Sequence, residues 1–118
     1  MEPKNKTDII ISKGGSSKEQ IIIVATELKK AANVLRAINH KLRQQIVKLL
    51  EENKRMNVTD IYVKLRLEQS VASQHLAILR RANIVRTERE GKFIHYSLNV
   101  PRIGNVAKFV TDLINSEA

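Results

Sequence analysis

The sequence has no cysteine and no tryptophan, and aromatic residues make up only 3% of its 118 positions. A chain without cysteine has no disulfides, no thiolate metal ligands and no thiol that senses redox state. Scarce aromatic side chains argue against a platform that stacks the bases of single-stranded nucleic acid. Whatever this chain binds, it recognises with other side chains.

Long apolar runs are missing as well. The longest, Ile21–Ala25, is much shorter than the roughly 18 apolar residues of a membrane-spanning helix. The N-terminal residues lack the apolar segment and the small-residue cleavage site of a signal peptide. We therefore expect a cytoplasmic protein that has no membrane partner.

Acidic residues are few relative to basic ones. Lysine and arginine total 21 against 12 aspartates and glutamates, which gives a net charge of +9 at pH 7. On a chain of single-domain size, such an excess points to nucleic acid, an anionic membrane surface or an acidic protein partner. The simpler alternative is that the charge only keeps the protein soluble.

The chain divides into a short arm and one domain. Residues 1–16 are mostly polar and run into a Gly-Gly-Ser-Ser stretch, which predicts a flexible N-terminal arm. The domain is expected over residues 17–118. Apolar residues at helical spacing from Ile21 to Leu35 predict a first helix that starts near Ser17, where Ser-Lys-Glu-Gln resembles a capping box.

The remaining elements are predicted from caps and turn signals. We expect a second helix capped by Asn39, a short third helix capped by Asn57 and a last helix that starts at Pro101. Two β-prone segments around Gly91 predict a hairpin before that last helix.

Residues 70–83, SVASQHLAILRRAN, predict a helix with two different faces. Ala72, Leu76 and Leu79 lie at spacings of four and three and form the face expected in the core. The opposite face has no acid, although a helix surface that is merely solvated usually mixes both signs of charge. That face carries Ser70, Ser73, Gln74, Ala77, Arg80 and Arg81.

The order of elements predicts a winged helix-turn-helix. The short third helix and the helix after it make a helix-turn-helix over residues 57–83. The hairpin over residues 84–98 is then the wing. The expected fold class is mainly α with a β-hairpin wing (α+β).

Three stretches resemble the winged-helix core of the ArsR-type family of bacterial transcription regulators. They are LRAINHKLRQQIVKLL, LEQSVASQHLAILRRANIV and REGKFIHYSL. The matching positions of the first are His40, Leu42, Arg43 and Ile46, and those of the other two include Gln69, Ser70, Ser73, His75, Leu76, Leu79, Ala82, Ile84, Val85, Arg89, Glu90, Gly91, Lys92 and Tyr96. The resemblance covers more than half of the chain, and the spacings between the pieces agree.

The resemblance implies a sequence-specific regulator of transcription that binds double-stranded DNA, with repression as the expected outcome. It also implies a homodimer, formed by the first and last helices, on a pseudo-palindromic operator. The predicted interface residues are Val24, Leu28, Phe109, Val110 and Leu113.

A helix in the major groove needs a face without acids that carries short donors and acceptors. The predicted DNA contacts of this helix are Gln69, Ser70, Ser73, Gln74, His75, Arg80 and Arg81. The predicted contacts of the wing and of other backbone-binding positions are Arg86, Arg89, Lys92, Lys41 and Arg43. Alternatives stay open: Gln69 or Ser70 as helix caps, a solvated Gln74, a partly buried His75, and a cross-strand salt bridge at Arg89.

The sequence departs from the family's metal-sensing members. Asn57 and Thr59 stand where those members carry cysteines, and Asp112 is the one acidic candidate in the middle of the last helix. Arg66 and Asn83 replace glycines that are frequent in the family. We therefore expect no metal site and no cofactor, and the sequence does not indicate an effector.

Catalytic patterns are absent too, since the chain shows no nucleophile triad, no phosphate-binding glycine loop and no paired carboxylates in an apolar setting. We expect no enzyme activity. Two other functions compete with the sequence-specific regulator. One is a protein-interaction module that kept the fold but lost DNA binding, and the other is a DNA-binding protein without sequence preference.

Overall fold

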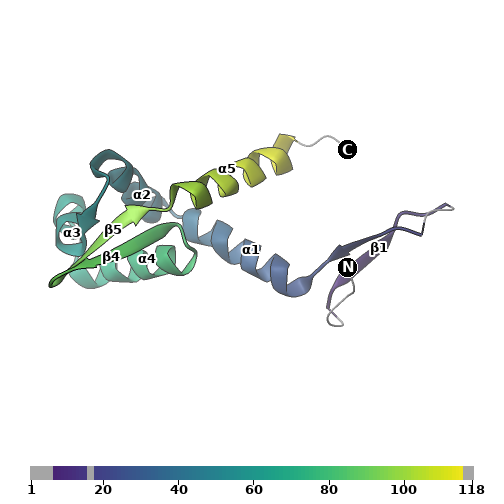
Figure 1. Ribbon diagram of the computed structural model, residues 1–118, viewed down its shortest axis with the longest axis horizontal. Coiled ribbons are helices and arrows are strands. Elements are labelled where there is room, and N and C mark those ends of the chain that lie inside the picture. The colour runs from purple at the N-terminus through teal and green to yellow at the C-terminus, as the bar shows by residue number, and fades with distance from the viewer. Residues whose placement is uncertain (1–6, 16–17, 116–118) are drawn as a thin grey trace. The chain divides into compact units, whose positions relative to one another are not determined.

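The computed structural model describes residues 7–15 and 18–115, which form two compact units (Figure 1). The first unit ends at Val34 and the second begins at Leu35. In chain order, the elements are β1 (Ile9–Ser12), β2 (Gln20–Ile23), α1 (Ala25–Ile38), α2 (Lys41–Asn53), β3 (Met56–Asn57), α3 (Val58–Leu65), α4 (Gln69–Arg81), β4 (Val85–Glu90), β5 (Phe93–Leu98) and α5 (Val100–Asn115).

The first unit contains a hairpin whose first strand lies in the predicted arm and whose second strand lies where we predicted helix. β1 and β2 pair antiparallel, with Ile9 opposite Ile23 and Ile11 opposite Ile21, so the prediction of a helix from near Ser17 is wrong for the residues of β2. Isoleucine is β-branched and fits a pleated strand better than a helix, and this preference outweighs the helical spacing. Ser17 itself lies outside the described residues.

The first helix begins instead at Ala25. The Ala25 amide donates a hydrogen bond of 2.7 Å to Oδ1 of Asp8, which satisfies one free amide of the helix's first turn. The same bond ties the residue before β1 to the residue where α1 begins. The predicted boundary between arm and domain at residues 16–17 stays a prediction, although β1 and β2 pair across it.

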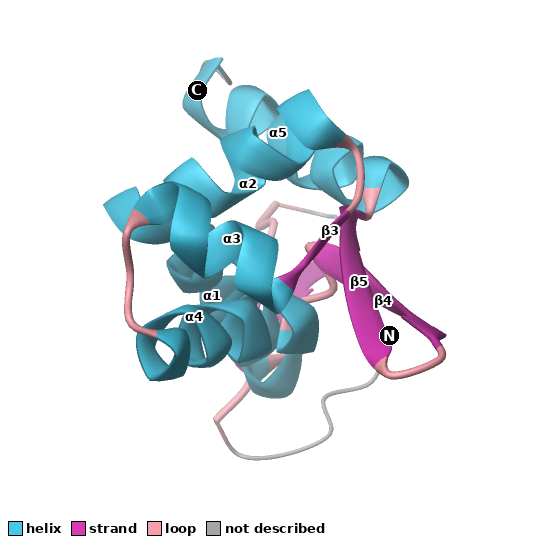
Figure 2. Cartoon of the chain, turned by 90° about the vertical axis from the view of Figure 1, so that its left-hand side faces the viewer, coloured by secondary structure: helices cyan, strands magenta, loops and turns pink. Residues whose placement is uncertain are grey.

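The second unit is the winged helix-turn-helix that we predicted. Figure 2 shows α3 lying against α4, with the β4–β5 hairpin projecting beside them. The three-stranded sheet has the order β3-β5-β4, and both pairings are antiparallel. Apolar side chains from α2, α3, α4 and the segment before β4 fill the core, and the fully buried ones are Ile46, Leu50, Ile61, Leu76, Leu79 and Ile84.

The helix ends follow local chemistry. The N-cap of α2 is His40, whose Nδ1 accepts from the Leu42 amide, so the prediction of Asn39 as the cap is wrong by one residue. Asn57 caps α3 as predicted, with its Oδ1 accepting from the Asp60 amide at 2.9 Å. Arg66 ends α3 in the left-handed conformation, with φ of 56°.

Helix α5 has an apolar face that the described residues leave exposed. None of its sixteen residues, all of which the structure describes, is buried. Phe109, Val110 and Leu113 are 48%, 41% and 62% exposed. Burying such side chains is favourable, so this face is suited to contact with another molecule.

Candidate nucleic-acid interface

The two faces of α4 lie as the sequence predicts. Ala72, Leu76 and Leu79 have 0% exposure and anchor the helix in the core. The opposite face is open to solvent, and its exposed residues are Gln69, Ser70, Ser73, Gln74, Ala77, Arg80 and Arg81. The core contacts therefore fix the orientation of α4 so that its acid-free face points outward.

The N-terminus of α4 is not capped by a polar side chain. Its N-cap is Glu68, which makes no side-chain capping bond, so Gln69 and Ser70 are not the caps that we considered as an alternative. Both are exposed in the first turn, where the helix dipole and the free amides favour an anion.

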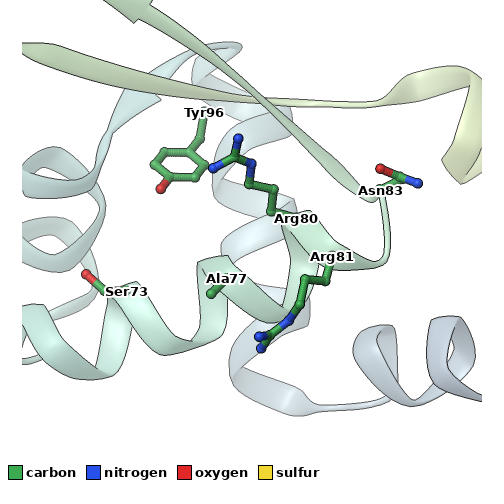
Figure 3. Close-up of a pocket in the computed structure, with 6 residues that line it drawn as sticks. All are labelled: Ser73, Ala77, Arg80, Arg81, Asn83 and Tyr96. Atoms are coloured by element: carbon green, nitrogen blue, oxygen red, sulfur yellow. The ribbon is translucent and has the colours of Figure 1, made fainter.

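An open cleft of about 440 Å³ lies between the C-terminal half of α4 and the wing sheet. Figure 3 shows Arg80 extending towards the ring of Tyr96, while Arg81 extends away from the sheet. No carboxylate lines the cleft, which is formed by Ser73, Ala77, Arg80, Arg81, Asn83 and Tyr96. Two guanidinium groups beside hydroxyl and amide donors are the groups that bind phosphate oxygens.

The register of the wing separates its two predicted arginines. Alternate residues of a strand face opposite sides, so Arg89 shares the face of Thr87, which pairs with Tyr96. Arg86 lies on the other face of the sheet. Arg89 therefore extends the positive surface of the cleft towards the wing tip, and Lys92 is exposed in the turn itself.

The acidic residues of the wing are paired within the chain. Arg55, just before β3, forms ion pairs with Glu90 and, at 3.9 Å, with Glu88. His95 Nε2 lies 3.6 Å from Glu90. Arg89 makes no ion pair among the described residues, and its Nε donates instead to the Gly91 carbonyl oxygen at 3.4 Å. The alternative of a salt bridge at Arg89 is therefore not what the structure shows.

His75 and Arg43 join α4 to the start of α2. Nη1 of Arg43 lies 3.2 Å from Nδ1 of His75, and the rings of His40 and His75 lie 4.9 Å apart. Partial burial, His40 and Arg43 together lower the pKa of His75. A neutral imidazole can accept the Arg43 hydrogen bond at Nδ1, whereas a protonated one cannot.

Arg43 also binds the end of α1. Its Nε donates to the Ala37 carbonyl oxygen at 2.6 Å, and its Nη2 donates to the Arg36 carbonyl oxygen at 3.1 Å. These bonds satisfy carbonyls that the last turn of a helix leaves free. Arg43 thus has a structural role in the chain, and its predicted contact with DNA stays a prediction, as does that of the exposed Lys41.

Asn57, which stands where metal-sensing members of the family carry a cysteine, has a structural role in this chain. Asn57 caps α3, and the neighbouring Thr59 is exposed. Among the described residues, no three histidine, aspartate or glutamate side chains lie close enough together to hold a metal ion. In the same part of the chain, no helix is both long and apolar enough to cross a membrane.

Comparison with known proteins identifies the family. Residues 40–87 match the model of the bacterial regulatory proteins of the arsR family. The transcriptional repressor PagR of Bacillus anthracis is 35% identical over 86 residues, which cover 73% of this chain and 86% of PagR. The chain belongs to the ArsR family.

Other ArsR-type relatives extend the comparison. The transcriptional repressor SdpR of Bacillus subtilis is 32% identical over 83 residues, covering 70% of this chain and 91% of SdpR. The crystal structure of PagR superposes with a TM-score of 0.59 over 72% of this chain and 97% of the crystallised PagR chain. HlyU from Vibrio cholerae superposes with a TM-score of 0.60 at 31% identity, over 76% of this chain and 97% of HlyU.

Membership of the ArsR family makes this chain a DNA-binding regulator of transcription, and the family's members are regulators rather than enzymes. DNA is therefore its partner. Sequence reasoning did not single out the Arg55 ion pairs or the place of Tyr96 in the cleft. Arg55 meets its glutamates only through the β3-β5-β4 order of the sheet, which no local pattern reveals.

Proposed function

We propose that the chain binds a pseudo-palindromic operator as a homodimer and represses transcription by occupying a promoter. The observation that carries the proposal is the exposed, acid-free face of α4, which continues into the cleft of Arg80 and Arg81. Phosphates flank the major groove, so a carboxylate on this face would be repelled, and guanidinium groups beside it are attracted.

Short polar side chains on α4 supply sequence recognition. Gln74 can pair with adenine through two hydrogen bonds, and Ser73 can bind a base edge or a phosphate. Ser70 and Gln69 lie at the N-terminal end, where a phosphate gains from the helix dipole. Arg80, Arg81 and the wing then supply the sequence-independent part of the binding energy.

Dimer formation is proposed from apolar surface that the chain does not cover. Leu28 of α1 is 53% exposed, and Leu113 of α5 is 62% exposed. Val24, also predicted for the interface, has only 3% exposure and so offers little area to a second copy. Two copies related by a two-fold axis would present two α4 helices to half-sites about one DNA turn apart.

Repression is supported by two relatives, since PagR and SdpR carry the name of transcriptional repressors. HlyU of Vibrio cholerae is a transcriptional activator, so the direction of regulation needs its own test. A reporter gene behind the chain's own upstream region should be expressed more strongly when the protein is deleted. Lower expression on deletion would mean activation.

DNA recognition by α4 is tested with two variants of the full chain. Ser73→Glu and Gln74→Glu each place a carboxylate on the proposed DNA face, and Thr111→Glu places one on exposed α5 as the control. Fluorescence anisotropy with duplexes from the upstream region should show a loss of about tenfold or more for the first two and little change for the control. An equal loss in all three, or none, would reject α4 as the reading helix and favour the protein-interaction alternative.

Dimer formation is tested separately. Phe109→Ser combined with Leu113→Ser should shift sedimentation of the chain from dimer to monomer, while Thr111→Ser should not. The far-ultraviolet circular dichroism of the double variant should stay unchanged, because α5 has no buried residue. A wild-type chain that sediments as a monomer at micromolar concentration would contradict the homodimer.

A further inference from the structure

The β1–β2 hairpin exposes isoleucine side chains that the described residues of its own unit leave about half uncovered. Residues paired across strands share a face, so Ile9, Ile11, Ile21 and Ile23 line one side of the hairpin. They are 46%, 49%, 47% and 39% exposed. The other side carries Ile10 and the partly buried Ile22 together with the polar Ser12 and Gln20.

The hairpin is held in place but is too small to be stable by its isoleucines alone. Asp8 binds the first amide of α1, and Lys13 forms an ion pair of 2.7 Å with Glu19 across the turn. An isolated two-stranded hairpin is only marginally stable in water, and a contiguous exposed apolar patch marks a binding surface. The four-isoleucine face therefore needs a partner surface.

We propose that the face of Ile9, Ile11, Ile21 and Ile23 packs against the same face of a second copy of this chain. The inference rests on the proposed homodimer, whose interface it enlarges. Each copy carries a net charge of +9, so two copies repel each other unless they meet through uncharged surface. β1 and β2 contain no charged residue, and an isoleucine face is complementary to itself, as a two-fold interface requires.

The hairpin is also continuous with the proposed interface. β2 ends at Ile23, and α1 begins two residues later and carries the exposed Leu28. Leu28 is thus close in the sequence to the isoleucine face, so a second copy that covers Leu28 can also reach that face.

The size of the face decides its role. Four side chains are few against the roughly 20–30 residues that each partner contributes to a standard interface. The hairpin face therefore strengthens a dimer that α1 and α5 form, and it does not make a dimer by itself. An anionic lipid surface is the other conceivable occupant, but neither strand offers a lysine or arginine to its headgroups.

The test compares the two faces of the hairpin in the full chain. Ile11→Thr with Ile21→Thr changes the four-isoleucine face, and Ile10→Thr with Ile22→Thr makes the same change on the other side. Threonine keeps the β-branched shape that strands favour. Sedimentation should show the dimer dissociation constant rising about tenfold for the first pair and less than about threefold for the second. Equal effects, or no effect of the first pair, would overturn the inference.

A charge-swap experiment separates loss of contact from loss of folding. Ile11→Lys and Ile11→Glu should each weaken the dimer alone, and an equimolar mixture should recover it as a heterodimer, because opposite charges then face each other. Misfolded hairpins would not be rescued by mixing, so absence of recovery counts against the inference.

Two controls distinguish the possible failures. If the wild-type chain is dimeric and binds DNA while both hairpin variants behave like it, only this inference fails. If the wild-type chain is monomeric and binds no DNA, the proposed function fails with it. Loss of binding to vesicles of phosphatidylserine and phosphatidylcholine in the first variant, with an unchanged dimer, would assign the face to lipid instead.

Discussion

Arg55 forms an ion pair with Glu90 across the wing sheet, and it lies 3.9 Å from Glu88 as well. Glu88 and Glu90 alternate with Arg89 along β4 and share the face of Arg86, so we expect their pairing with Arg55 to reduce the negative charge that the wing as a whole brings towards DNA. We therefore expect Arg55 to affect DNA binding through these glutamates and not by touching DNA itself.

We expect Arg55→Gln to weaken DNA binding several-fold while leaving the fold intact, because exposed ion pairs contribute little to stability. The loss should shrink at high salt, where screening reduces the repulsion of the unpaired glutamates. Glu90→Gln alone should raise affinity slightly, and Arg55→Gln with Glu90→Gln should recover most of the loss. An additive double variant in anisotropy titrations would show that the two residues act independently.

Arg80 and Arg81 should bind phosphate without reading bases. Replacing either with alanine should weaken binding to all duplexes alike and lower the slope of log affinity against log salt by about 1. Lys48→Ala, an exposed change on α2, serves as the control for loss of net charge. A change in sequence preference, with the salt slope unaltered, would assign these arginines to bases instead.

Gln74 should carry sequence discrimination. Gln74→Ala should reduce the preference for one base pair by about 1–3 kcal/mol and leave affinity for unrelated duplexes nearly unchanged. Binding to a set of duplexes that each change one base pair measures this directly. If all positions lose affinity together, Gln74 contacts the backbone and not a base.

His75 should make folding stability depend on pH. Its pKa in the folded chain is lowered by burial, His40 and Arg43, so below its ordinary pKa of about 6.5 the unfolded chain binds the proton more readily. Stability should therefore fall as pH drops from 7.5 towards 5, and this part of the fall should be missing in His75→Gln. Thermal unfolding at a series of pH values compares the two chains, and identical profiles would contradict the assignment.

Arg66 should be a site where glycine stabilises the chain. Its φ of 56° and ψ of 47° cost an L-residue about 1–2 kcal/mol. Glycine avoids this strain, but part of the gain is lost because glycine also raises the conformational entropy of the unfolded chain. We expect Arg66→Gly to gain up to about 1 kcal/mol and raise Tm by a few degrees. Asn83→Gly, at φ of 60°, should gain less because asparagine tolerates this conformation. A lower Tm for Arg66→Gly would show that the arginine side chain itself stabilises the turn.

Local patterns predicted the helix-turn-helix and the wing. Helical spacing alone identified the buried Ala72, Leu76 and Leu79, and the glycine between two β-prone segments identified the turn at Gly91. The hairpin of β1 and β2 was missed because Ile21 and Leu28 satisfy helical spacing, while the pairing with β1 is a non-local contact. The Arg55 ion pairs were missed for the same reason. The cap of α2 was placed one residue early, because His40 and not Asn39 combines an extended backbone with a side chain that accepts from the Leu42 amide.

Nuclease footprinting of the wild-type chain on its own upstream region tests the central proposal most directly. A homodimer that inserts two α4 helices should protect two half-sites related by two-fold symmetry, with centres about 10 base pairs or a multiple of that apart. Protection should disappear with Ser73→Glu at the same protein concentration. Uniform protection along the fragment, or protection that Ser73→Glu leaves unchanged, would contradict a sequence-specific dimer that reads DNA through α4.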